Sequence, residues 1–188
     1  MPAGASTLPI QLRPPHPGEE RWLAYFLYLA IYTPPGQPMP PTNLIWLPNL
    51  RIYHQGFGTR PGDLCLYAFA GATQTSHAVN ATSRPIGAAW ARLLPAGTNA
   101  DGSPRPAGYG SILPNVPELS IAIRPAWRGQ GVGTRLLGAL LSALAQNGYA
   151  QCSLSVQAAN PALRLYQRIG FSTVHTHGDE LAMLWQAG

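Results

Sequence analysis

Residues 118–133 read ELSIAIRPAWRGQGVG and join an alternating segment to a glycine-rich turn. In residues 118–123, Leu119, Ile121 and Ile123 fall on one face of an extended chain, which predicts a β-strand. After RGQGVG, apolar side chains recur at helical spacing from Val132 to Leu144, and Gly148 is a natural stop. The stretch therefore predicts a strand, a glycine loop and an amphipathic helix in direct succession.

The glycine loop has the chemistry of a phosphate site. The first backbone N–H groups of a helix lack intrahelical partners, and the positive end of the helix dipole lies there. Glycine allows a ligand to approach the backbone closely, and Arg128 adds a positive charge. We expect a phosphate or pyrophosphate to bind here.

Two common nucleotide motifs do not fit this loop. The dinucleotide pattern GxGxxG requires a third glycine at position 134 or 136, where the chain has Thr134 and Leu136. The P-loop requires a lysine, and all 12 basic residues of the chain are arginine. A purely structural turn remains an alternative, which three alternating glycines after an arginine make unfavourable.

The rest of the chain supplies the remaining layers of an α/β domain with a mixed sheet. Prolines interrupt residues 33–41, and residues 95–117 form a long segment without a clear element, which is typical of a functional lid or disorder. The other expected elements are a strand at 10–12, an apolar helix from about 17 to 32, a helix at 43–55, strands at 64–70, 86–94 and 152–156, a helix that Asn160 caps and Gly170 ends, and strands at 171–175 and 181–185.

Two motifs in order resemble the GNAT superfamily of acetyl-CoA-dependent N-acetyltransferases. Residues 128–133 match its Arg-x-x-Gly-x-Gly signature, and residues 160–171 resemble its later N-x-x-A-x-x-L-Y-x-x-x-G-F motif with one residue fewer after Asn160. The resemblance implies a mixed, mostly antiparallel central sheet, splayed between two adjacent parallel strands and flanked by about four helices. It also implies one domain over 1–188, with a substrate-side part at 1–84 and an acetyl-CoA-binding core at 85–188.

The resemblance implies where acetyl-CoA binds. Its pantetheine arm pairs with the strand at Ile121, Ala122 and Ile123, and Asn160 contacts the arm from the other side. The pyrophosphate rests on the loop and the start of the helix, formed by Arg128, Gly129, Gln130, Gly131, Val132, Gly133 and Thr134.

Acetyl transfer to an amine requires a base for the amine and an acid for the departing thiolate. Glu118 begins the strand beside the expected slot and is the candidate base; a solvated or ion-paired carboxylate is the equally weighted alternative. Tyr166 occupies the position of the general acid in many superfamily members, with simple packing as its alternative. Ser120 shares a face with Glu118 and is a candidate for substrate or water binding.

The acceptor pocket is less specific in the sequence. His54, Tyr109 and residues 95–117 are candidates because superfamily members often build the acceptor pocket there. Trp22, Tyr25, Tyr28 and Tyr32 are further candidates for a pocket or a dimer surface, although core packing explains them more simply. No metal site is expected, because His175 and His177 lack a third ligand.

The formal net charge of +5 and the pI of about 9.6 raise the question of nucleic acid. The arginines are spread from Arg13 to Arg168 without a basic cluster, so nucleic-acid binding is not expected. No apolar run reaches the roughly 18 residues of a membrane span, and no secretion-like start is present, so a cytoplasmic protein without membrane association is expected.

The resemblance thus implies an N-acetyltransferase that uses acetyl-CoA and releases coenzyme A. The acceptor is the primary amine of a small molecule or peptide, and both a monomer and a homodimer remain open. The alternative is a catalytically silent acyl-CoA-binding module with a regulatory role or a role in protein interactions.

Overall fold

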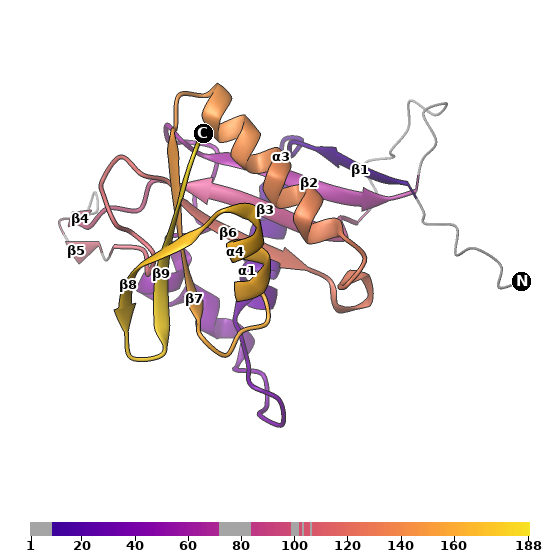
Figure 1. Ribbon diagram of the computed structural model, residues 1–188, viewed down its shortest axis with the longest axis horizontal. Helices are drawn as coiled ribbons and strands as arrows, with labels where there is room; N and C mark the ends of the chain where they lie inside the picture. Colours follow the sequence, from indigo (N-terminus) through magenta and orange to yellow (C-terminus); the bar gives the residue numbers. More distant parts are fainter. Residues whose placement is uncertain (1–8, 72–83, 99–101, 103, 106) are drawn as a thin grey trace, which may run out of the picture.

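The computed structural model describes residues 9–71, 84–98, 102, 104–105 and 107–188 (Figure 1). Seven strands form one sheet in the order β1-β2-β3-β6-β7-β9-β8, and β4 and β5 form a separate small ribbon. The strands are β1 (Ile10–Arg13), β2 (Leu64–Ala70), β3 (Gly87–Arg92), β4 (Gly97–Thr98), β5 (Pro104–Arg105), β6 (Glu118–Ile123), β7 (Gln151–Gln157), β8 (Ser172–His177) and β9 (Glu180–Gln186).

The sheet is mixed, as predicted, with one parallel pair in its middle. All other neighbouring strands run antiparallel, whereas β6 and β7 run parallel and pair only at Glu118 and Ser153. The Ser153 N–H donates to the Pro117 carbonyl over 2.9 Å, and beyond this point the two strands separate. The splayed sheet expected from the sequence is confirmed.

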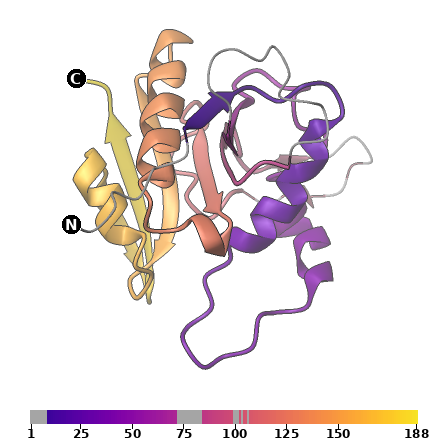
Figure 2. The same cartoon turned by 90° about the vertical axis from the view of Figure 1, so that its right-hand side faces the viewer.

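Helices cover both faces of the sheet (Figure 2). On one face lie α3 (Val132–Gln146) and α4 (Leu163–Ile169), and on the other lie α1 (Trp22–Ala30) and α2 (Pro48–Arg51). Short 3₁₀ helices precede α1 (η1, Glu19–Arg21), α2 (η2, Thr42–Trp46) and α3 (η3, Pro125–Trp127). The predicted stripe of α3 is confirmed, because the helix buries Val132, Leu136, Leu137, Leu140, Leu141 and Leu144. This burial orients the glycine loop at the end of β6.

Three details of the predicted helices are wrong. The single helix expected at 43–55 is divided, because Leu47 is extended and Pro48 starts α2 at its first position. Helix α4 starts at Leu163 rather than directly after Asn160, whose Oδ1 accepts the Ala162 N–H over 2.9 Å in a turn before the helix. Helix α1 is shorter than the helix expected from about 17 to 32, because a 3₁₀ turn at Glu19–Arg21 precedes it and it ends at Ala30.

The segment at 95–117 contains the β4–β5 ribbon and then approaches the sheet. Residues 99–101, 103 and 106 lie outside the described residues, as do residues 72–83 between β2 and β3. The Gly108 N–H donates to the Leu94 carbonyl over 2.9 Å. A Cβ at Gly110 would collide with the backbone of Leu154 and Ser155, so only glycine allows this approach to β7.

Candidate functional site

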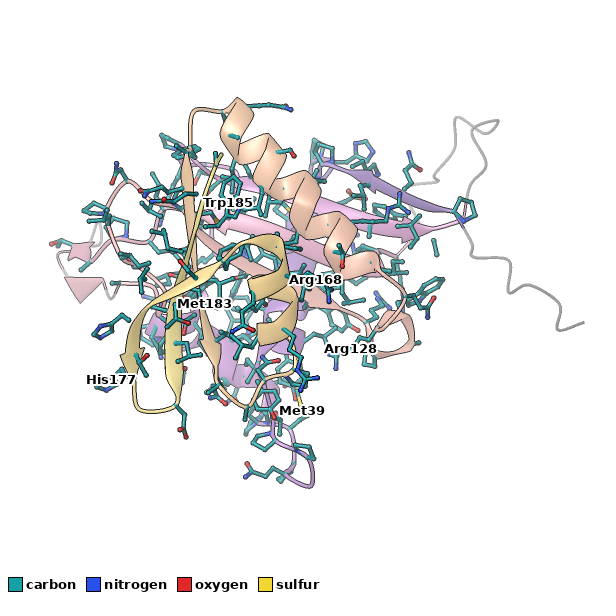
Figure 3. All side chains as sticks on the ribbon, in the orientation of Figure 1. Met39, Arg128, Arg168, His177, Met183 and Trp185 are labelled. Atoms are coloured by element: carbon teal, nitrogen blue, oxygen red, sulfur yellow. The ribbon has the colours of Figure 1, made fainter. Side chains whose placement is uncertain are left out.

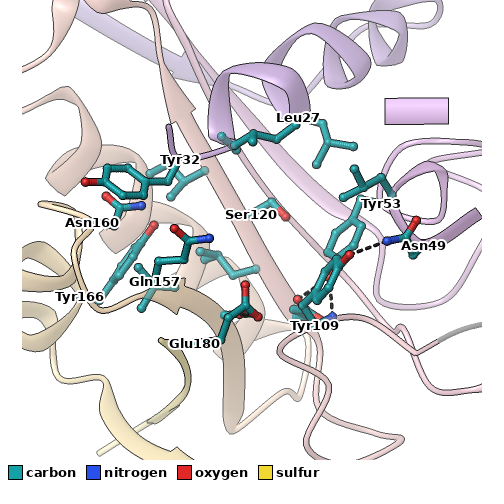
Figure 4. Close-up of a pocket in the computed structure, with 18 of the residues that line it drawn as sticks. Leu27, Tyr32, Asn49, Tyr53, Tyr109, Ser120, Gln157, Asn160, Tyr166 and Glu180 are labelled. Carbon is teal, nitrogen blue, oxygen red and sulfur yellow. Dashed lines mark hydrogen bonds between the residues drawn. The ribbon is translucent and has the colours of Figure 1, made fainter. Parts of the chain in front are cut away.

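A cavity of about 310 Å³ opens on the α1 side, where β6 and β7 part. The end of α1, η2 and α2 form one wall, and β6, β7 and the start of α4 form the other (Figure 4). Tyr166 and Asn160 lie on one side of Ser120, and Tyr53 and Tyr109 lie on the other. The cavity therefore connects the two halves that the sequence assigns to the acetyl-CoA-binding core and the substrate side.

Glu118 lies at the floor of this cavity, at the first position of β6. Its Oε1 accepts two hydrogen bonds, from the Tyr53 hydroxyl at 2.7 Å and from the Gly110 N–H at 2.8 Å. The residue is 3% exposed, and its Oε2 has no hydrogen-bond partner among the described residues. One carboxylate oxygen is thus held in place, while the other keeps its capacity to accept a proton.

The environment makes Glu118 an unusually weak acid. Burial raises its pKa from 4.5 to about 7; the hydrogen bonds from Tyr53 and Gly110 oppose this shift, and the charge of Glu180 adds to it. A carboxyl group with a pKa near neutrality can both accept and release a proton under physiological conditions.

The loop at 108–110 packs directly against this carboxylate. The Tyr109 N–H donates to the Tyr53 hydroxyl over 2.7 Å, and Asn49 Nδ2 donates to the Tyr109 hydroxyl. A Cβ at Gly108 would collide with the Glu118 carboxylate. The two glycines on either side of Tyr109 therefore let the loop approach Glu118 and hydrogen-bond to it.

Tyr166 lines the same cavity from α4. Its ring packs edge-to-face on Phe171, with ring centroids 6.0 Å apart, and the residue is 8% exposed. Burial raises the pKa of Tyr166 to about 12, so its hydroxyl keeps its proton at neutral pH. Tyr166 can therefore serve only as a proton donor in that range.

The edge of β6 that faces the opened gap carries the backbone groups of alternate residues. The Arg124 N–H donates to the Ile86 carbonyl on the β3 side over 2.9 Å. Backbone groups of successive strand residues point to opposite sides, so those of Ile121 and Ile123 point away from β3 and into the gap between β6 and β7. Those of Ala122, opposite Ala88, face β3. The geometry thus brings Ile121 and Ile123 to the slot and leaves Ala122 to pack against α1.

The glycine loop lies at the far end of β6 from Glu118. Gly129 and Gly131 have φ of +74° and +78°, and Gly131 caps α3 without a side-chain hydrogen bond. Figure 3 shows Arg128 on this loop, and its Nε donates to the Ile123 carbonyl over 3.0 Å. The loop residues from Arg128 to Gly131, together with Thr134, are exposed, so the unpaired amides of the first turn can accept an anionic group.

A buried arginine holds the chain segment that carries Tyr53. Arg92 on β3 is 1% exposed and forms an ion pair with Asp63 over 2.7 Å. Its two terminal nitrogens also donate to the carbonyls of Ile52, Gln55 and Gly56 at 2.7–2.9 Å. The position of Tyr53 beside Glu118 therefore depends on a charge inside the core.

The structure brings seven of the residues that the sequence singles out to one cavity. Of the candidates from the sequence, Glu118, Tyr166, Ser120, Ile121, Asn160, Tyr109 and Tyr32 line the cavity. His54 does not: its Nε2 lies 3.0 Å from the Ile45 carbonyl, and its ring packs against Trp46. Within the described residues there is no group of three metal-ligating side chains, and His175 and His177 lie on the exposed strand β8.

The sequence reasoning missed Tyr53 and Glu180, and it named Gly110 only as part of the candidate segment 95–117. Glu180 begins β9, lines the cavity and accepts the Ser155 hydroxyl over 3.1 Å. Its pairing with Gln157 across the sheet brings it there, and no local motif indicates this.

Within the described residues, no helix is both long and apolar enough to cross a membrane.

Comparison with known proteins gives consistent matches. The family model "Acetyltransferase (GNAT) family" matches residues 63–171. The mycothiol acetyltransferase of Saccharomonospora viridis is 35% identical over 100 residues, which cover 53% of this chain and 30% of that protein. The [ribosomal protein bS18]-alanine N-acetyltransferase of Haemophilus influenzae is 38% identical over 64 residues, which cover 34% of this chain and 44% of that protein. The matches thus span less than half the length of each of these relatives.

Among solved structures, the PaiA N-acetyltransferase of Thermoplasma acidophilum, in complex with coenzyme A, superimposes with a TM-score of 0.61. The sequence identity is 17%, and the match covers 95% of this chain and 99% of that one. At this identity the likeness concerns the fold.

Proposed function

Since the chain belongs to the acetyltransferase (GNAT) family, we propose that it is an N-acetyltransferase that moves an acetyl group from acetyl-CoA to a primary amine. The observation that carries the proposal is one cavity, open where β6 and β7 part, that contains both a carboxyl with a pKa near 7 and a protonated tyrosine. Residues 85–188 are proposed to bind acetyl-CoA, and residues 1–84 to form the substrate side. The cytoplasmic location and the homodimer stay predictions of the sequence.

Acetyl-CoA supplies the acetyl group as a reactive thioester and leaves as a thiol. The exposed amides of the glycine loop and Arg128 would hold its pyrophosphate. The gap-facing backbone groups of Ile121 and Ile123, with Asn160 across the slot, would hold its arm. The same backbone N–H groups are suited to polarise a carbonyl oxygen.

Glu118 acts as the base in this proposal. Tyr53 and Gly110 hold Oε1, and Oε2 has no partner among the described residues, so the carboxylate takes the amine proton through a water molecule in the cavity. Removal of this proton is required because an ordinary alkylamine has a pKa near 10 and is mostly charged at neutral pH.

Tyr166 acts as the acid for the departing sulfur, so replacing it should slow catalysis without changing the binding of acetyl-CoA. We expect Tyr166→Phe to lower kcat by about 10²-fold, the usual loss when one general acid is removed, with the Kd for acetyl-CoA unchanged. Tyr149→Phe, a tyrosine packed outside the cavity, is the control and should keep kcat. A Phe variant with wild-type kcat would leave Tyr166 with a packing role only.

Binding of acetyl-CoA can be tested before any acceptor is known. Acetyl-CoA or coenzyme A at 100 times its Kd adds about 2.7 kcal/mol, which should raise Tm by roughly 5–11 °C, whereas NAD should not raise it. A shift without turnover of any amine would favour the silent acyl-CoA-binding module, and no shift up to millimolar concentrations would refute the proposal.

The chain offers a matched pair of glycines for this test. Gly131 and Gly18 both precede helices with positive φ, +78° and +84°, and a Cβ on either meets no atom within 4 Å. Alanine should therefore strain both sites alike. Only Gly131→Ala should reduce the acetyl-CoA shift, because its Cβ enters the space proposed for the pyrophosphate; an equal loss in both variants would contradict this placement.

A further inference from the structure

The acceptor end of the cavity has an apolar wall. Leu27 and Ile31, at the end of α1 and just after it, face the cavity with Leu44 and Leu50 from η2 and α2. The ring of Tyr32 continues this wall towards Asn160 (Figure 4). A ligand that fills this end is desolvated against hydrocarbon, so an apolar body is favoured and a second charge on it is costly.

The charged groups of the cavity have one sign. Glu118 and Glu180 line it, and none of the described lining residues is an arginine or a histidine. The contrast with the whole chain is large, since the chain has 12 arginines and only seven acidic residues. Oε2 of Glu118 is buried against Gly108 and has no hydrogen-bond partner among the described residues, so the carboxylate that lines the cavity keeps an unused capacity to accept from an ammonium group or its water.

We infer, on the basis of the proposed function, that the acceptor is a primary amine on an apolar body, without a carboxylate beside the amine. A carboxylate next to the amine would lie near two acidic side chains with no lining cation to pair with it. Free amines and the N-terminal residue of a peptide share the favoured chemistry.

A matched series of leucine derivatives tests this inference with acetyl-CoA as donor. Isopentylamine, leucinamide and leucine carry the same apolar body and differ in the group beside the amine. We expect kcat/KM for isopentylamine and leucinamide to exceed that for leucine at least tenfold. The amine of isopentylamine is more basic than that of leucine, so its preference cannot arise from easier deprotonation.

A tetrapeptide that begins with Leu and ends in an amide distinguishes the two kinds of acceptor, a free amine and the N-terminal residue of a peptide. A higher kcat/KM for the peptide than for isopentylamine would indicate a peptide N-terminus, and the reverse a free amine. Use of leucine equal to or better than that of isopentylamine would overturn the inference. The absence of turnover with isopentylamine, leucinamide and the tetrapeptide would also overturn it. If acetyl-CoA still raises Tm in that case, only the acceptor class is wrong. If acetyl-CoA does not raise Tm, the proposed function fails as well.

Two neighbouring leucines provide a test within the protein. Leu44 lines the cavity, whereas Leu47 is 47% exposed and is not part of its lining. Leu44→Ala should raise KM for isopentylamine about tenfold and leave KM for acetyl-CoA unchanged, while Leu47→Ala should change neither. Equal KM values in both variants would show that this wall does not contact the acceptor.

Discussion

Replacing Glu118 with glutamine is expected to lower kcat at least about 10²-fold while the Kd for acetyl-CoA stays the same. Glutamine retains the size of the side chain and a carbonyl oxygen that can accept from Tyr53 and Gly110, but it cannot take a proton from the amine. Asp179→Asn is the matched control, since Asp179 is an exposed carboxylate at the turn before β9. Wild-type kcat in the Glu118 variant would remove Glu118 from the mechanism.

The pH profile should carry the same signature. A base works only when it is deprotonated, so with a pKa of about 7 wild-type kcat/KM should fall about tenfold for each pH unit well below 7. In Glu118→Gln this dependence should disappear, and only the titration of the amine substrate itself should remain. If the profile of Glu118→Gln were the same as that of the wild type, the fall in kcat/KM below pH 7 would come from another group.

Loss of activity in this variant should not come from unfolding. The folded pKa of Glu118, about 7, lies above its ordinary 4.5, so the stability this carboxyl contributes is complete below pH 4.5 and is lost as the pH rises through 7. Glutamine does not titrate, so at pH 8 the variant should equal or exceed the wild type, by up to about 3 kcal/mol. Thermal unfolding at pH 5 and pH 8 measures this difference.

Replacing Arg92 with methionine is expected to destabilise the protein by about 3–5 kcal/mol and to lower Tm by roughly 6–20 °C. The variant leaves Asp63 buried without its countercharge, since both of its carboxylate oxygens accept from Arg92 at 2.7–2.8 Å. It also removes the donors to the carbonyls of Ile52, Gln55 and Gly56. Calorimetry of the purified variant measures the loss.

Two further variants show whether the buried charge is the cause. Arg135 is exposed and donates one hydrogen bond, to the Ile10 carbonyl, so Arg135→Met should change stability by less than about 1 kcal/mol. Adding Asp63→Leu to Arg92→Met should recover part of the stability, because no unpaired charge then remains in the core. A loss below about 1 kcal/mol in Arg92→Met alone would contradict this account.

Local patterns in the sequence predict the elements around the site well. The β6 and β7 regions, the α3 stripe and the glycine loop follow from hydrophobic periodicity and from where glycine stands. Local patterns were less informative from 43 to 55 and at Asn160, where a proline and a side-chain turn shift the helix starts by a few residues. Such shifts depend on backbone angles that composition alone does not determine.

The sequence by itself determined the α/β fold class and, through its resemblance to the GNAT superfamily, made the glycine loop, Glu118 and Tyr166 candidates, because each motif consists of residues that are neighbours along the chain. Only the tertiary structure decided what surrounds them. Tyr53 reaches Glu118 across 65 positions of the chain, and Glu180 reaches the cavity by pairing with β7. The pKa of Glu118 is set chiefly by burial, a property of the packed molecule rather than of any segment.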